Sequence, residues 1–246
     1  MFLQYKFLII LRAIWFMAQI AFFGIIASRM VVPALADIYF EYYVAGVIIM
    51  MLYSTSVFIG YDIFEEAEHG VFEYLLSLPV SRRELVLGRS IGGGIRSFFF
   101  VGPLIVIALW VIGLANPVNF LIALAALFLF AFGVSGLSIT IAVGLKSSDR
   151  FDIFMGAFNA FIVRLSTAMY PLVFIQEANS AYSALAYFNP VTFASDLFRW
   201  GTGIERYLTL SPMPWAAIVG LVLFFFTFTF VGVTFYEKRL EGGGWK

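Results

Sequence analysis

The stretch FFFVGPLIVIALWVIGLANPVNFLIALAALFLFAFGVSGLSITIAVGL, residues 98–145, decides the class of fold because it contains no charged residue. Two long and mainly apolar runs, 90–113 and 119–145, meet near Asn116 and Pro117. A helix needs about 20 apolar residues to cross the hydrocarbon core of a bilayer. The stretch therefore predicts two membrane-spanning helices that are joined by a tight turn.

The composition of the whole chain extends this prediction. Of the 246 residues, 62% are hydrophobic and 12% are charged, whereas a soluble domain is about half apolar. Four further apolar runs are long enough to span a membrane: 12–32, 42–61, 153–175 and 215–236. Because backbone groups in lipid must bond internally and no barrel-like alternation occurs, we predict helices. The fold class is an all-α integral membrane protein with six transmembrane helices in one domain, 1–246.

Several kinds of chemistry are excluded by residue counts. The chain has no cysteine and one histidine, so it offers neither a thiolate nor a histidine cluster for a metal ion. We expect no catalytic residues and no bound metal. The net charge is zero, which gives no sign of a nucleic-acid partner. The apolar start lacks a small-residue cleavage site, and we interpret it as retained.

The distribution of Lys and Arg predicts the orientation in the membrane. One side collects Lys6, Arg12, Arg82, Arg83, Arg89, Lys146, Arg150, Lys238, Arg239 and Lys246. The other side collects Arg29, Arg199 and Arg206. The richer side is predicted to be cytoplasmic, and six spans then place both termini there.

A long charged segment, 61–89, separates the second and third predicted spans. Its apolar residues recur at steps of three and four: Phe64, Ala67, Val71, Leu75 and Leu78. This spacing predicts one amphipathic helix over 64–78, with Glu65, Glu66 and Glu68 in its first turns, where the helix dipole favours acids. Pro79 ends the helix, and Ser81 with Glu84 forms a capping box that starts the third span.

Two interpretations of this acidic helix are open. It could lie on the inner surface of the membrane, but helices of that kind usually present basic residues to anionic lipid. Alternatively, an acidic helix near the inner face matches a basic protein surface.

A second long polar segment, 176–214, precedes the last span. Asn189 and Pro190 predict a helix start, and Asp196 and Arg199 are spaced to pair on its polar face. The residues alone are compatible with an aromatic helix at the membrane interface.

Three motifs carry a resemblance to a known family. They are Glu41-Tyr-Tyr-Val-Ala-Gly46, then Glu66-x-Glu68-x-Gly70-x-x-Glu73-x-Leu75-Leu76-x-x-Pro79-Val80-Ser81-Arg82-x-Glu84-x-x-x-Gly88-Arg89, and Asn189-Pro190-x-Thr192-Phe193-x-x-Asp196-x-x-Arg199. Over essentially its whole length, the chain resembles the membrane permease subunit of type-2 ABC transporters. Ala45 stands where the family commonly has proline.

The resemblance implies an exporter subunit in the cell membrane of a prokaryote, working as a homodimer with a separate ATP-binding cassette ATPase. MgATP would bind to that partner, since this chain has no phosphate-cradling Gly-rich run followed by Lys. Helix 64–78 would be the coupling helix, with docking residues Glu65, Glu66, Glu68, His69, Val71, Phe72, Leu75, Arg82 and Arg83. The segment 176–214 would be a re-entrant pair of short helices on the outside.

Candidates for the translocation path are Arg164, Asn189, Pro190, Asp196 and Arg199. Arg164 falls about midway through the fifth predicted span, where an arginine either faces a wet path or has a structural partner. An ion-coupled transporter or channel that uses Arg164 is the alternative function. The short loops favour a hydrophobic or amphipathic cargo, such as a drug, a lipid or a glycolipid-like molecule.

Overall fold

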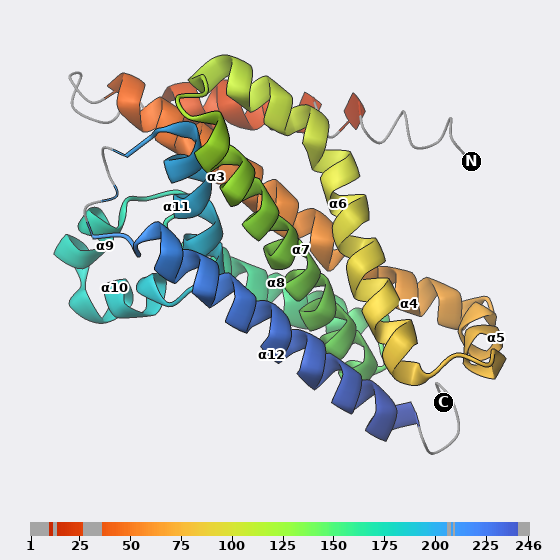
Figure 1. Ribbon diagram of the computed structural model, residues 1–246. Coiled ribbons are helices and arrows are strands. Elements are labelled where there is room, and N and C mark those ends of the chain that lie inside the picture. Colours follow the sequence, from red (N-terminus) through yellow and green to blue (C-terminus); the bar gives the residue numbers. More distant parts are fainter. Residues whose placement is uncertain (1–9, 12–13, 27–35, 206–207, 209, 241–246) are drawn as a thin grey trace.

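The computed structural model describes residues 10–11, 14–26, 36–205, 208 and 210–240 (Figure 1). All regular elements in these ranges are helices, which confirms the all-α prediction. Four helical stretches among them are long and apolar enough to cross a membrane: Tyr39–Glu68, Arg82–Ile112, Pro117–Leu145 and Pro214–Phe235. They correspond to the second, third, fourth and sixth predicted spans.

The other two predicted spans have different outcomes. The span 12–32 lies partly outside the described residues, and its described part includes the π-helix η1 (Gln19–Gly24). The prediction of one continuous helix over 153–175 is wrong. Helix α8 (Ser148–Arg164) ends at Arg164, inside the predicted span, and α9 (Leu172–Ala178) begins after a non-helical segment.

The interruption after α8 has a local cause in the sequence. The hydroxyl of Ser166 donates to the carbonyl of Val163 at 2.6 Å, so this side chain competes with the helical backbone. Pro171 disfavours helical geometry in the residue before it and has no N–H of its own to donate. Residues 165–171 therefore form a non-helical connection, which we call the α8–α9 loop.

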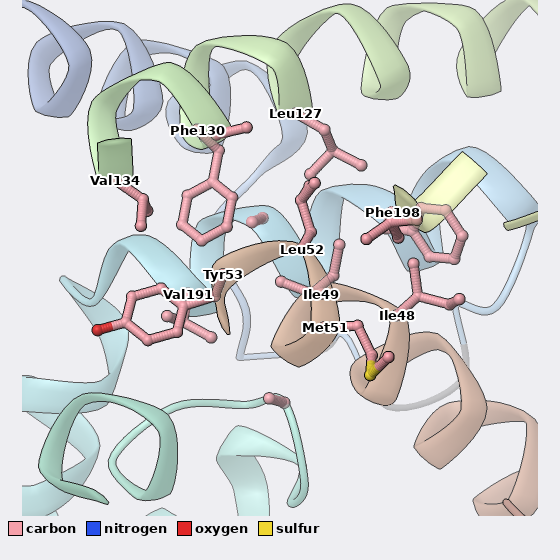
Figure 2. Packing of buried hydrophobic residues seen from close by; sticks show 14 of the residues in the cluster. Ile48, Ile49, Met51, Leu52, Tyr53, Leu127, Phe130, Val134, Val191 and Phe198 are labelled. Carbon is pink, nitrogen blue, oxygen red and sulfur yellow. The ribbon is translucent and has the colours of Figure 1, made fainter. Parts of the chain in front are cut away.

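Helix α7 (Pro117–Leu145) is the centre of the fold. It packs against α3 (Ala36–Val57), α4 (Ile59–Glu68), α6 (Arg82–Ile112), α8, α11 (Pro190–Thr202) and α12 (Pro214–Leu240). Figure 2 shows the core, in which Ile49 and Leu52 of α3 lie near Leu127 of α7. Helix α11 is buried on most of its surface, although it is too short to be a span.

Glycines allow the close approach of α12 to α7. A Cβ atom added to Gly232 of α12 would lie 2.9 Å from the hydroxyl of Thr140, and one added to Gly133 of α7 would lie 2.7 Å from the ring of Phe224. Small residues at helix interfaces are the usual way in which membrane helices approach closely.

The polar connections gather at two ends of the molecule. At one end lie α5 (Val71–Ser77), the beginning of α6 and the end of α12 (Figure 1). The α7–α8 turn joins them there, since the hydroxyl of Tyr61 in α4 donates to Asp152 of α8 at 2.6 Å. The opposite end holds α9, α10 (Ser180–Tyr187) and the α6–α7 turn (Figure 1).

Candidate functional site

The charged segment between α3 and α6 forms an elbow of two short helices, and the prediction of one helix over 64–78 is wrong in its continuity. Helix α4 ends at Glu68, and α5 begins at Val71. Gly70 between them has a φ of 68°, a left-handed conformation that glycine adopts without the steric cost of a side chain. A glycine just beyond the last helical residue is a common helix stop.

This break reverses the prediction for the acidic residues. Glu65, Glu66 and Glu68 lie in the last turns of α4 rather than in the first turns of a helix. Carboxylates at a helix C-terminus face the negative end of the dipole, so the dipole does not explain their position.

Ion pairs to α6 stabilise part of the acidic residues of α4, which the helix dipole does not. The carboxylate of Glu66 pairs with Arg89 of α6. One turn earlier in α4, Asp62 pairs with Arg96 at 2.6 Å. Helices α4 and α6 are therefore held together by two charged contacts, which are one turn apart on α4 and about two turns apart on α6.

The remaining predicted docking residues differ in accessibility. Glu65, Glu68, His69, Val71 and Arg83 are exposed, whereas Glu66, Leu75 and Arg82 are half-buried. The side chain of Phe72 lies outside the described part of the structure. The exposed acids of α4 and the apolar Val71 of α5 thus lie on the outside of the elbow.

The start of α6 matches the sequence prediction. The hydroxyl of Ser81 accepts from the backbone N–H of Glu84 at 3.3 Å, and the backbone N–H of Ser81 donates to the Glu84 carboxylate at 2.9 Å. The capping box is confirmed, and it fixes the angle at which the chain enters α6.

At the other end of the molecule, Arg199 of α11 is the centre of a buried polar cluster. Its guanidinium donates to Asp196 at 2.9 Å, to the carbonyl of Tyr42 at 3.0 Å and to the carbonyl of Ala168 at 3.0 Å. The same guanidinium lies 3.4 Å from the centre of the Tyr42 ring, which is cation–π geometry. The predicted pairing of Asp196 with Arg199 is confirmed, but the pair is not on an exposed face, since these side chains are 2% and 0% exposed.

The other polar residues of the same motif hold the α8–α9 loop. The side-chain amide of Asn189 donates to the carbonyls of Ile162 and Leu165, both at 2.7 Å. The Thr192 hydroxyl accepts from the backbone N–H of Thr167, and the Thr167 hydroxyl donates to Asp196 at 2.8 Å. One face of α11 thereby satisfies backbone groups that the end of α8 leaves without helical partners.

Asn189 has a second role, which the sequence predicted. Its side-chain oxygen accepts from the backbone N–H of Val191 at 2.9 Å, and Pro190 occupies the first helical position of α11. The predicted helix start is confirmed.

Arg164 is the last residue of α8, and its side chain is exposed. It lines a cavity of about 320 Å³ together with Tyr170, Phe174 and Tyr182. The structure therefore separates Arg164 from the buried Arg199 cluster, although both were predicted as path residues.

Four residues that take part in the Arg199 cluster or in the ion pairs of the elbow were not predicted from the sequence. Tyr42 and Ala168 contribute backbone carbonyls, and a carbonyl has no signature in a sequence. Asp62 and Arg96 carried a weak signal, because charged residues within an apolar stretch need partners. Nothing in their spacing, however, connects residues on two different helices.

The comparison with known protein families gives a match over most of the chain. Residues 1–202 match the family described as ABC-2 type transporter, a range that includes the elbow and the Arg199 cluster and ends before α12. No curated protein and no solved structure gives a significant match. The match covers most of the chain and confirms the resemblance found in its motifs. The chain therefore belongs to the ABC-2 type transporter family, as a multi-pass membrane permease component of an ABC transporter and not its ATPase.

Proposed function

We propose that this chain is the transmembrane subunit of an ATP-binding cassette exporter in the cell membrane of a prokaryote, with both termini in the cytoplasm. Two copies form the translocation path, and a separate ATPase subunit binds MgATP and docks on the elbow of α4 and α5. The observation that carries the proposal is the elbow itself, in which exposed acids lie on a segment that is tied to α6 by two ion pairs.

The elbow is built to pass a displacement to the spans. Helix α4 follows α3 with only Phe58 between them, so it is nearly continuous with a membrane-crossing helix. The Asp62–Arg96 and Glu66–Arg89 pairs connect α4 to α6. A movement of the docked ATPase would therefore displace α3 and α6 together, and nucleotide binding would shift the permease between two states.

The outer end shapes the path. In this proposal, α9, α10 and α11 form the re-entrant segment that closes the path on the outside. Asn189, Asp196 and Arg199 act by holding the α8–α9 loop, with Pro190 fixing the start of α11. Arg164, exposed at the end of α8, lies where a hydrophobic or amphipathic cargo would pass.

Dimerisation is supported by the surface of α8. Ile153, Phe154 and Phe161 are large apolar side chains that are exposed along this helix. Such a face needs either lipid or another protein surface to cover it. A second copy of the chain is the occupant that we propose, because two copies would then enclose the Arg164 side of the molecule.

The family membership leaves the ion-coupled carrier without support. Its only candidate residue, Arg164, is exposed at a helix end rather than held with a charged partner at mid-span. We therefore keep the ATP-driven permease as the single proposed function.

Reversal of charge on the elbow tests the docking. Glu65 and Glu68 are exposed, whereas Glu66 is occupied by Arg89, so the sharpest variant is the double substitution Glu65→Lys with Glu68→Lys. We expect it to reduce co-purification of the ATPase subunit by about tenfold or more, through like-charge repulsion at the interface. The measurement is the ATPase-to-permease ratio after extraction in mild detergent.

A matched control is Glu177→Lys, an exposed glutamate on α9 at the opposite end of the molecule. It should leave the ratio unchanged. If the elbow variant retains the full ratio while the spans stay folded, the proposed docking surface is wrong.

A further inference from the structure

A groove runs between the beginning of α6 and the second half of α12. Its cavity has a volume of about 550 Å³. The lining includes Arg83 and Leu87 of α6 and Phe225, Phe226, Thr229 and Phe230 of α12. Phe226 and Phe230 are largely exposed, so this groove is open toward the surroundings of the two helices.

The groove has its positive charge at one end. Arg83 is the second residue of α6 and lies directly after the elbow. Its guanidinium has the planar donor geometry that suits phosphate oxygens. At this end of a membrane helix, a basic side chain lies near the headgroups of the predicted cytoplasmic leaflet, where anionic lipids concentrate.

Deeper in the groove lies a hydroxyl that has no hydrogen-bond partner among the described residues. Thr229 is 7% exposed, and its Oγ1 atom makes no hydrogen bond to any described residue. A threonine hydroxyl within a helix commonly donates to the carbonyl four residues earlier, and Thr234 of the same helix does so, to the carbonyl of Phe230 at 2.9 Å. A buried hydroxyl with no acceptor is unfavourable, so the position of Thr229 favours a ligand that brings an acceptor.

The depths of these groups follow a definite order. A Cβ atom on Gly232 of α12 would lie 3.9 Å from Val86 of α6, which places these two residues at one level. Arg83 lies three residues from that level toward the elbow, and Thr229 lies three residues from it in the other direction. At 1.5 Å per residue their levels differ by about 9 Å. Phe225 and Phe226 lie deeper still.

We propose that this groove binds one anionic glycerophospholipid. Its phosphate pairs with Arg83, an ester carbonyl accepts a hydrogen bond from the hydroxyl of Thr229, and an acyl chain lies along Phe225 and Phe226. A glycerophospholipid carries these three chemistries in the same order, from headgroup to tail. The occupant is a lipid because the described lining is aromatic and apolar below Arg83, which matches neither a polar peptide nor an acidic surface.

The test uses the full chain without any ATPase subunit, so its result is independent of the proposed docking. The purified protein in detergent is titrated with phosphatidylglycerol or with phosphatidylcholine of the same acyl chains, and bound lipid is counted by native mass spectrometry. We expect tighter binding of phosphatidylglycerol. Arg83→Gln should lower that affinity about tenfold, the effect of one charge-assisted hydrogen bond, and should leave phosphatidylcholine unchanged.

Two further variants make the test specific. Thr229→Val keeps the shape of the side chain and removes the hydroxyl, so it should lower the affinity for both lipids by about fivefold. Arg150→Gln removes an exposed arginine from the first turn of α8, at the same end of the molecule, and should change neither affinity.

Three results would overturn the proposal. Equal phosphatidylglycerol affinity in Arg83→Gln and the unchanged chain is the first. An equal loss in Arg150→Gln is the second, because it would mean a diffuse attraction of charge. The third is an unchanged affinity for both lipids in Thr229→Val, because the Thr229 hydroxyl would then have no acceptor on the lipid.

Discussion

At the scale of single residues, Arg199 connects three parts of the fold. It joins α11 to the carbonyl of Tyr42, 157 positions earlier in the chain, and to that of Ala168, 31 positions earlier. Gly46 makes this arrangement possible, because an added Cβ would lie 1.7 Å from the carbonyl oxygen of Ala168 and 2.9 Å from the guanidinium. The cluster therefore depends on a glycine at position 46 as well as on the Asp196–Arg199 pair.

Asp196→Ala should destabilise the protein strongly. The substitution leaves the guanidinium of Arg199 buried without its counter-charge, and breaking a buried pair in this way costs about 3 kcal/mol of unfolding free energy. The measurement is reversible unfolding in bicelles. Asp149→Ala, which removes an exposed acid from the first turn of α8, should cost less than about 1 kcal/mol. Equal losses in the two variants would contradict the structural role of the cluster.

At the scale of elements, the relation of α4 to α6 depends on the two ion pairs described above. They differ in environment, since the side chain of Arg89 is 9% exposed while that of Arg96 is 36% exposed. The less exposed pair is screened less by water and should contribute more to holding the elbow.

Glu66→Ala should loosen the elbow, whereas Glu65→Ala should not. We expect hydrogen exchange in the first turns of α6 to increase about fivefold, corresponding to about 1 kcal/mol for a partly exposed pair. Exchange of Glu66 and Arg89 between the two positions, Glu66→Arg with Arg89→Glu, should recover part of the protection. A double variant that is no better protected than Glu66→Ala would show that the pair does not hold these helices together.

The starts of the elements could be predicted from the sequence, but their interruptions could not. Ser81 with Glu84 and Asn189 with Pro190 mark helix starts by contacts within one turn, so local spacing is enough. The stop at Gly70 and the break after Arg164 fall inside patterns that continue with helical or apolar residues. The carbonyl of Leu165, at this break, accepts from the side chain of Asn189, 24 positions later, and no local rule contains that contact.

The same distinction applies to the candidate site. The spacing of Asp196 and Arg199 predicted their pairing, which is a contact between neighbouring turns of one helix. It did not predict that the pair is buried, because burial depends on α3 and on the α8–α9 loop. The sequence therefore predicted which residues pair in this cluster, but not that the pair is buried and joins α11 to the rest of the fold.

At the scale of the whole molecule, the core is concentrated around α7, while α8 leaves an apolar face exposed. A monomer with this face would expose it to lipid, whereas a pair of chains joined along α8 would cover it. The chain has no cysteine, so a single introduced cysteine reports one contact without background.

Ala157→Cys, on the exposed side of α8, should form a disulfide between two copies under mild oxidation in the membrane. Val219→Cys, half-exposed on α12, should stay monomeric and serves as the control. The readout is the dimer band on a non-reducing gel. A dimer through Val219→Cys, with none through Ala157→Cys, would place the interface on α12 instead.

The long separation between Tyr42 and Arg199 also has a consequence for biogenesis. The ribosome delivers α3 to the membrane well before it has synthesised α11. The earlier helices are therefore in the bilayer before the side chain of Arg199, which joins them to α11, has been made. Until residue 199 emerges, the carbonyls of Tyr42 and Ala168 lack their donor. We expect a nascent chain halted just before that residue to leave the end of the molecule that holds α9 and α10 open to membrane proteases, and completion of the last fifth of translation to close it.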